Sequence, residues 1–285
     1  FSGVTPTTFT ASGASSWMYT GLTTGNLTNG VVHQIEVWGV DVAGSTGTAT
    51  ASSFTFDNSV PVSSVTTPVG NSRVNSLPTI SGTANDPAPG VVSVVQAQIL
   101  RDSDGFYWDG VGTWVAPITW LNVTGTATWT LSGSSLPVWV DGATHTVRSR
   151  AQDTAGNVQS VPPNVFFTFD TSAPSAPTVT LTDPGTSALN LSWGSSTDTI
   201  KDYGVYRATW SAPFGAKILM TRVAAPGVTH QDGALAGNRY YYQLSARDTA
   251  LNESGGSAEV NGVAGTPAVP TGLAMVIPPQ TVGRA

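Results

Sequence analysis

The chain of 285 residues contains no cysteine and little charge. Charged residues make up 10% of it, against the ~25% typical of globular proteins. Without cysteine, disulfides and thiol chemistry are excluded. With 11 basic and 17 acidic residues, the net charge of −6 argues against a surface that binds nucleic acid. No apolar run reaches the ~18 residues that a membrane span requires, so none is expected.

The amino-terminal segment, which begins at Phe1, has neither the basic nor the apolar region of a signal peptide. We therefore expect the chain to be either mature or a piece of something longer. Its composition is rich in Ser, Thr, Gly and Asn, and it contains only two lysines. This composition is typical of secreted and cell-surface proteins, so we expect an extracellular or cell-surface location.

The sequence repeats itself, which indicates tandem copies of one fold. Residues 54–57 (Phe-Thr-Phe-Asp) recur at 167–170, 113 residues further along. This spacing is one residue longer than the spacing of 112 residues found for other matched positions, and a one-residue insertion in a loop produces such a difference. Three further pairs lie 112 residues apart: Trp17 and Trp129, His33 and His145, Asp41 and Asp153.

The second copy has the pattern of β-strands throughout. Apolar and polar residues alternate, as in 146–151, and turn residues separate the alternating segments. Short strands at this spacing, without a 3.6-residue period, predict an all-β fold of tandem antiparallel β-sandwiches. A closed barrel is left as the alternative. The predicted strands are 60–65, 78–84, 91–101, 114–121, 127–131, 145–153 and 165–170.

The repeat also predicts how the chain divides. A new module is expected to start near the carboxyl terminus, because 267–271 repeat the pattern of 174–178. The predicted divisions are the C-terminal half of one copy of the repeat at 1–57, a complete copy at 58–170, a third domain at 171–265 and the first strand of a further module at 266–285.

A half-module at 1–57 leaves an apolar face and unpaired strand edges uncovered, so something must cover it. Two explanations stay open. In the first, the chain is a fragment of a long tandem array. In the second, residues 268–282 of one chain complete the half-module of the next, and the chains form a head-to-tail filament.

Several segments of the third domain resemble a known family. Residues 171–265 resemble a fibronectin type III domain, which implies a seven-stranded sandwich with Trp193 in its core and Tyr240 at the tyrosine corner. Leu235 lies one residue closer to Tyr240 than in that family's pattern. The resemblance rests on 174–177 (Pro-Ser-Ala-Pro), 189–193 (Leu-Asn-Leu-Ser-Trp), 203–207 (Tyr-Gly-Val-Tyr-Arg) and 235–248.

Two five-residue segments, 153–157 (Asp-Thr-Ala-Gly-Asn) and 248–252 (Asp-Thr-Ala-Leu-Asn), resemble a turn of bacterial Ig-like and fibronectin-like modules. In those modules the turn follows a strand. Residues 104–114 resemble the Ig-like repeats of large bacterial surface proteins. Together these resemblances imply tandem bacterial Ig-like repeats, with the C-terminal half of an Ig-like module at 1–57 and a complete Ig-like module at 58–170, followed by a fibronectin type III-like domain at 171–265.

The sequence offers little for catalysis. His33 and His145 occupy equivalent repeat positions, which favours a structural role, and His230 stands alone. No motif of a serine hydrolase, zinc protease or phosphate-binding loop occurs. With three glutamates and with several aspartates at repeat-equivalent turns, the paired carboxylates of a glycosidase are not expected. We therefore expect a non-enzymatic chain.

Calcium is the one cofactor considered, because hard cations take clustered oxygen ligands from loops. Asp102, Asp104 and Asp109 place three carboxylates within eight residues. The segment lacks the closing glutamate of an EF-hand, and Asp-Gly is a hairpin signal, so a plain turn is the favoured alternative. A second possible site uses Asp57 or Asp170 with a neighbouring Asp or Asn at a module junction.

Aromatic stacking on sugar rings is the remaining binding chemistry. Trp108, Trp114 and Trp120 are spaced by six residues, and an even spacing places residues of one strand on one face. The favoured alternative is that these rings fill the sandwich core. Trp210, in a polar loop, is the better candidate for an exposed ring.

These features predict a non-enzymatic, extracellular segment of a multi-module surface protein with a structural or adhesive role, including a filament or sheath component. The alternative is a set of linker or carbohydrate-contacting modules in a secreted polysaccharide-degrading enzyme. Expected partners are neighbouring modules, copies of the chain itself, and polysaccharide or cell-surface components. No nucleic acid is expected.

Overall fold

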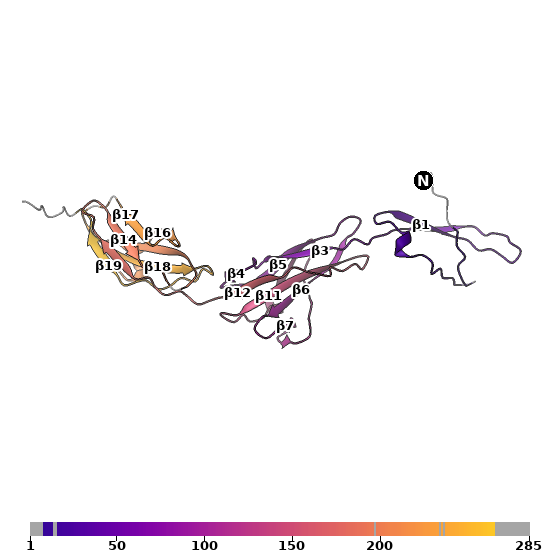
Figure 1. Cartoon of the computed structure of the whole chain (residues 1–285), viewed down its shortest axis with the longest axis horizontal. Coiled ribbons are helices and arrows are strands. Elements are labelled where there is room, and N and C mark those ends of the chain that lie inside the picture. Colours follow the sequence, from indigo (N-terminus) through magenta and orange to yellow (C-terminus); the bar gives the residue numbers. More distant parts are fainter. Residues whose placement is uncertain (1–7, 14–15, 197, 234, 236, 266–285) are drawn as a thin grey trace, which may run out of the picture. The chain divides into compact units, whose positions relative to one another are not determined.

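The computed structural model of the chain describes residues 8–13, 16–196, 198–233, 235 and 237–265 (Figure 1). Within these residues the regular structure consists of β-strands and three single-turn 3-10 helices, so the predicted all-β fold is confirmed. No described helix is long and apolar enough to cross a membrane. The predicted strand at 266–285 lies outside the described residues.

The described residues divide into two compact units. The first unit comprises those within Phe1–Gly70, Leu77–Val138 and Thr144–Phe166. The second comprises those within Asn71–Ser76, Trp139–Ala143 and Phe167–Ala285. The module boundaries inferred from the repeat stay predictions.

The amino-terminal part of the first unit is a two-stranded antiparallel sheet of β1 (Val32–Val37) and β2 (Thr50–Thr55). No described residue between 8 and 57 is buried. Trp17 is 50% exposed and Trp38 is 41% exposed. Two strands cannot enclose a core, so the apolar side chains of this segment lie at its surface.

The rest of the first unit is built from antiparallel strands in two sheets. One sheet has the order β10-β5-β3, and in the other β6 pairs with β11, β7 and β9, while β8 pairs with β7. Ile80, Ile99, Val147 and Trp129 fill the space between them. The strands are β3 (Val62–Thr67), β5 (Thr79–Asn85), β6 (Val92–Arg101), β7 (Phe106–Trp108), β8 (Trp114–Val115), β9 (Leu121–Asn122), β10 (Thr128–Ser132) and β11 (Thr144–Asp153).

The prediction of a single strand at 114–121 is wrong. The structure has two separate two-residue strands in this region, β8 and β9. Pro117 lies between them and has no N–H to donate to a neighbouring strand. The hydroxyl of Thr119 donates instead to the carbonyl of Pro117 at 3.1 Å, which holds a local turn. The three-residue strands β7 and β4 (Ser72–Val74) were not predicted, because so short a run carries no readable alternation.

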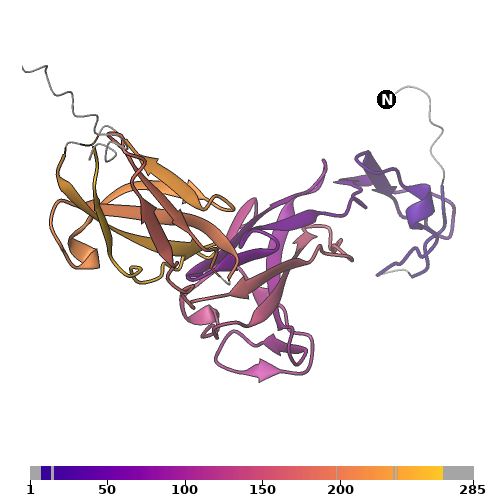
Figure 2. The same ribbon diagram turned by 60° about the vertical axis from the view of Figure 1, so that its left-hand side comes forward.

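In the second unit, residues 167–169 of β12 (Val165–Phe169) pair in parallel with β4, with Phe167 opposite Ser72. Seven further strands form a sandwich with sheet orders β13-β14-β17 and β16-β15-β18-β19 (Figures 1 and 2). Their bounds are β13 (Val179–Thr182), β14 (Leu189–Trp193), β15 (Ile200–Ala208), β16 (Ile218–Ala224), β17 (Thr229–Asp232), β18 (Arg239–Asp248) and β19 (Val260–Val263).

The core of this sandwich confirms the predicted place of Trp193. Its side chain is buried at the end of β14, and its ring centroid lies 5.5 Å from that of Tyr203 on β15. Tyr240 also lies in this core, beneath the guanidinium of Arg207. The seven strands match the number that the resemblance to a fibronectin type III domain implies.

Candidate metal centre

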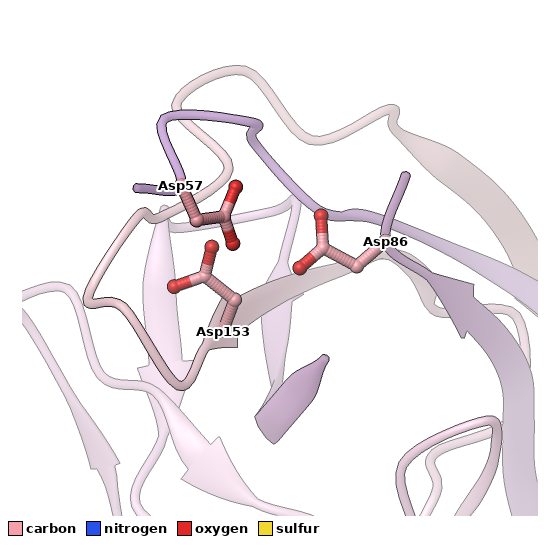
Figure 3. Close-up of side chains that lie close together, drawn as sticks. All are labelled: Asp57, Asp86 and Asp153. Carbon is pink, nitrogen blue, oxygen red and sulfur yellow. The ribbon is translucent and has the colours of Figure 1, made fainter. Parts of the chain in front are cut away.

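Three aspartates from distant parts of the sequence meet within the first unit. Asp57 follows β2, Asp86 follows β5, and Asp153 ends β11. Each offers a carboxylate oxygen, and these oxygens all lie within 4.8 Å of one another. Figure 3 shows the three carboxylates pointing toward a common centre. An all-oxygen set of this kind is what hard divalent cations bind.

Asp153 is held by the five-residue turn that the sequence singles out. Its Oδ1 accepts the backbone N–H of Asn157 at 2.8 Å, and its Oδ2 accepts the Asn157 side-chain amide at 2.8 Å. The same amide group donates to the backbone carbonyl of Asp57 at 3.2 Å. Asn157 therefore fixes one aspartate by its side chain and a second by its backbone.

Asp57 is held by its own linker and by a neighbouring turn. Its Oδ1 accepts the backbone N–H of Ser59 at 2.9 Å. Asn29 accepts the N–H of Asn58 and donates to the hydroxyl of Ser59, both at 2.9 Å. These bonds to consecutive residues of the linker set the direction in which the Asp57 side chain leaves the backbone.

Asp86 differs from the other two aspartates because no hydrogen-bond donor contacts its carboxylate. Both of its carboxylate oxygens are buried, and neither has a hydrogen-bond partner. The carboxylate packs against Gly90, where an added Cβ would lie 2.1 Å from Oδ2. Burial, together with repulsion from Asp153 and Asp57, raises the pKa of Asp86 above its ordinary value. No ion pair of the described residues includes any of the three aspartates.

The second unit repeats this arrangement with one difference. Asn252 donates its backbone and side-chain N–H groups to Asp248 at 2.8 and 2.9 Å, and its amide also donates to the backbone carbonyl of Asp170 at 2.8 Å. Here a guanidinium group supplies the positive charge: Arg73 Nη1 lies 2.8 Å from Oδ2 of Asp170. The hydrogen bond to Asp170 raises the pKa of Arg73, and the charges of Asp170, Asp198 and Asp248 add to the effect.

The aspartates predicted as a calcium site occupy three separate hydrogen-bonded positions. Asp102 accepts the hydroxyl of Thr146 at 2.7 Å. Asp104 pairs with Arg101 at 2.5 Å, and this hydrogen bond lowers the pKa of Asp104. Oδ1 of Asp109 accepts three consecutive backbone N–H groups, those of residues 111–113. These are the bonds of the turn that the sequence offers as the alternative, and calcium at Asp102, Asp104 and Asp109 stays a prediction.

The sequence points to Asp57 and to the turn at 153–157, but it gives no sign of Asp86. This residue stands in the loop Asp-Pro-Ala-Pro and has no counterpart in the repeat as it is read from the sequence. Because β5 and β11 belong to different sheets, Asp86 comes close to Asp153 only through the tertiary fold of the first unit. The sequence therefore predicts that a neighbouring Asp or Asn joins Asp57, but it does not identify that residue as Asp86.

The tryptophans predicted for stacking do not form a row on one strand. Trp108 is 6% exposed and donates its indole N–H to the carbonyl of Ser135 at 2.8 Å. Trp114 lies opposite it on β8, with ring centroids 5.4 Å apart. The ring of Trp120 is covered by the guanidinium of Arg150 at 4.3 Å. Trp210 is 57% exposed, as the sequence suggests for its loop, and stacking by these rings stays a prediction.

No family model matches the chain. Exoglucanase B of Cellulomonas fimi is 32% identical over an alignment of 154 residues, which covers 46% of this chain and 13% of that enzyme. The chain therefore spans a small part of the length of the curated relative that it matches.

Among solved structures, the FN1–FN3 domains of chicken CNTN1 are 14% identical, with 83% of this chain and 76% of that one covered and a TM-score of 0.43. The fibronectin(III)-like modules of Clostridium thermocellum CbhA are 14% identical, with coverage of 72% and 95% and a TM-score of 0.41. Both of these solved structures are, by their names, tandem domains of the fibronectin type. The all-β architecture itself rests on the strands described above.

Proposed function

We propose that the chain is a non-catalytic accessory segment of a secreted polysaccharide-degrading enzyme. The observation that carries the proposal is the 32% identity to part of exoglucanase B of Cellulomonas fimi. The matched part is 13% of that enzyme, so most of its length lies outside the match, as it would if the chain corresponded to an accessory part. The lysine-poor composition, rich in Ser, Thr, Gly and Asn, supports secretion, and the lack of cysteine is compatible with it.

The carboxylates of the chain also support a non-catalytic role. A glycosidase needs one carboxylic acid and one carboxylate on opposite sides of a bound sugar. Glu253 and Glu259 are paired with Arg222 and Lys217, at 2.8 and 2.6 Å. The three converging aspartates each point a carboxylate oxygen at the other two, within 4.8 Å, so they face one another and do not form the acid and base pair on either side of a sugar. A structural or adhesive surface protein has less support, since no observation links the chain to such a protein.

Immunodepletion tests this proposal. Antibodies against the chain are used to deplete the culture medium of its source, and hydrolysis of soluble cellulose derivatives is measured before and after. We expect the activity to fall with the antigen, and the purified 285-residue chain to release no sugar by itself. Antigen found on the cell surface, with the activity of the medium unchanged, would favour the adhesive alternative.

Among the tryptophans suggested for stacking, Trp210 is the most exposed, at 57%. We expect Trp210→Ala to weaken the affinity of the chain for insoluble cellulose by about fivefold, because one stacked aromatic ring contributes on the order of 1 kcal/mol. Trp210→Phe is the matched control and should keep most of the retention. Equal retention of the alanine variant and the native chain would remove Trp210 as a contact.

A further inference from the structure

We propose that Asp57, Asp86 and Asp153 together bind one calcium ion, and that this ion supplies the positive charge that Arg73 supplies at the corresponding position of the second unit. The ion joins the linker after β2, the loop after β5 and the end of β11. This inference is independent of the proposed function, because it rests on the geometry of the first unit alone.

The first step of the argument is the state of Asp86. A buried carboxylate without a hydrogen-bond donor is costly, and such groups in native proteins are paired or coordinate a metal. Both oxygens of Asp86 are buried and unpartnered, and the residue faces two further carboxylates. Hydrogen bonds already hold Asp57 and Asp153 in place, so the cluster is organised before any ion enters.

The second step is the comparison between the two units. Asn157 and Asn252 make the same three hydrogen bonds, each to an aspartate and to the carbonyl of a linker aspartate. The linker aspartate of the second unit, Asp170, meets a guanidinium group, whereas Asp57 forms no ion pair with a described residue. The same backbone arrangement therefore brings acidic groups together once in each unit. Among the described residues, only the group in the second unit is paired with a cationic side chain, that of Arg73.

The ligand chemistry selects calcium among common metals. Calcium takes six to eight oxygen ligands at about 2.3–2.6 Å in flexible geometry, and water completes sites with few protein ligands. Magnesium requires a near-ideal octahedron and gives up its water reluctantly. Zinc favours histidine and cysteine, and the cluster contains neither. Three carboxylates held on separate loops suit the larger ion.

The test measures calcium binding and thermal unfolding of the whole 285-residue chain after treatment with a chelator. Isothermal titration with calcium chloride should give one site per chain. At calcium 100-fold above its Kd, the Tm of the first unit should rise by about 5–10 °C. The same concentration of magnesium chloride should give a smaller rise. No calcium binding, or an equal shift with magnesium, would overturn the proposal.

Two variants locate the site. Asp86→Asn should weaken calcium binding at least about tenfold, because the number of charged ligands sets the affinity of such sites. In chelator it should melt no lower than the native chain, since it removes an unpaired charge, and this separates loss of binding from loss of fold. Gly90→Ala keeps every charge but places a Cβ 2.1 Å from Oδ2 of Asp86, so it should also weaken binding.

Asp109→Asn is the matched control, because it removes the same charge from the calcium site suggested by the sequence. We expect it to bind one calcium ion with unchanged affinity. The reverse pattern, in which Asp109→Asn loses the ion and Asp86→Asn keeps it, would overturn the assignment to Asp57, Asp86 and Asp153.

Discussion

Replacing Trp129 with alanine is expected to destabilise the first unit by about 3–5 kcal/mol, the range for removing a large aromatic side chain from a core. The Trp129 ring is 1% exposed, and its indole N–H lies 3.3 Å from the carbonyl of Thr83. The ring lies directly over Gly82, where an added Cβ would meet it at 2.3 Å. Alanine would leave a cavity that the paired backbones of β5 and β10 cannot close.

Trp17 provides the matched control for this variant, because it occupies the equivalent repeat position but is 50% exposed. Trp17→Ala should change the free energy of unfolding by less than about 0.5 kcal/mol. Differential scanning calorimetry of both variants gives the comparison, because each unit can unfold in its own transition. Similar losses for the two variants would mean that Trp129 does not hold a core.

Replacing Arg222 with methionine is expected to destabilise the second unit by about 2–4 kcal/mol. Arg222 contacts Asp202 at 3.0 Å and Glu253 at 2.8 Å, and its side chain is 25% exposed. Removing one member of a largely buried ionic group leaves the others without compensation. Asp202 keeps Arg247, and Glu253 keeps the Tyr206 hydroxyl, so part of the network survives.

The loss of stability caused by Arg222→Met should depend on pH. Burial alone would raise the pKa of Asp202 and of Glu253, but hydrogen bonds from Arg222 and other neighbours outweigh it and lower both values. The unfolded chain therefore takes up protons first as the pH falls, near about 4. The stability that the network contributes is present above about pH 5 and is lost as the pH falls through the folded pKa values.

Calorimetry at pH 7 and pH 3 checks this dependence. The difference in Tm between the native chain and Arg222→Met should be smaller at pH 3 than at pH 7. Arg239→Met is the control in the same unit, because Arg239 is exposed and its guanidinium donates to the neutral side chain of Asn261. It should change stability by less than about 0.5 kcal/mol. An Arg222 effect that is the same at both pH values would show that packing, and not charge, is lost.

Much of the fold could be predicted from local pattern. Strands such as β6 and β11 alternate over ten residues, and the burial of Trp193 follows from its place in a fibronectin-like segment. The predictions failed for strands that are short or interrupted. β4 and β7 have three residues each and were not predicted. The strand predicted at 114–121 was wrong because Pro117 divides a segment whose apolar pattern is otherwise continuous. Local alternation cannot identify strands that exist only because a neighbour pairs with them.

The candidate site shows a similar limit. The five-residue turn at 153–157 is visible in the sequence because its hydrogen bonds are local, and Asp57 is visible because it recurs as Asp170. Asp86 has neither a local motif nor a repeat counterpart, and it reaches Asp153 only in the folded unit, where strands of two different sheets come together. By contrast, Asp102, Asp104 and Asp109 are dense in sequence, yet each carboxylate is engaged by nearby groups in its own position.

Calcium binding and the proposed function are connected only through stability. A secreted segment of low charge has few ion pairs with which to hold its loops, and in this chain charged residues make up 10% of the total. One ion joining three loops adds stability without new apolar burial, by binding the folded state and not the unfolded one. Loss of calcium should therefore weaken the first unit and leave the second unit, with its Arg73–Asp170 pair, unchanged.

The most direct test of the central claim is to isolate the protein that carries this sequence from the culture medium of its source and to sequence it by mass spectrometry. We predict an intact mass well above 29.3 kDa, with peptides of a glycoside hydrolase domain in the same polypeptide. A polypeptide containing only further β-sandwich repeats and a surface anchor would contradict the proposal of an accessory segment in a polysaccharide-degrading enzyme.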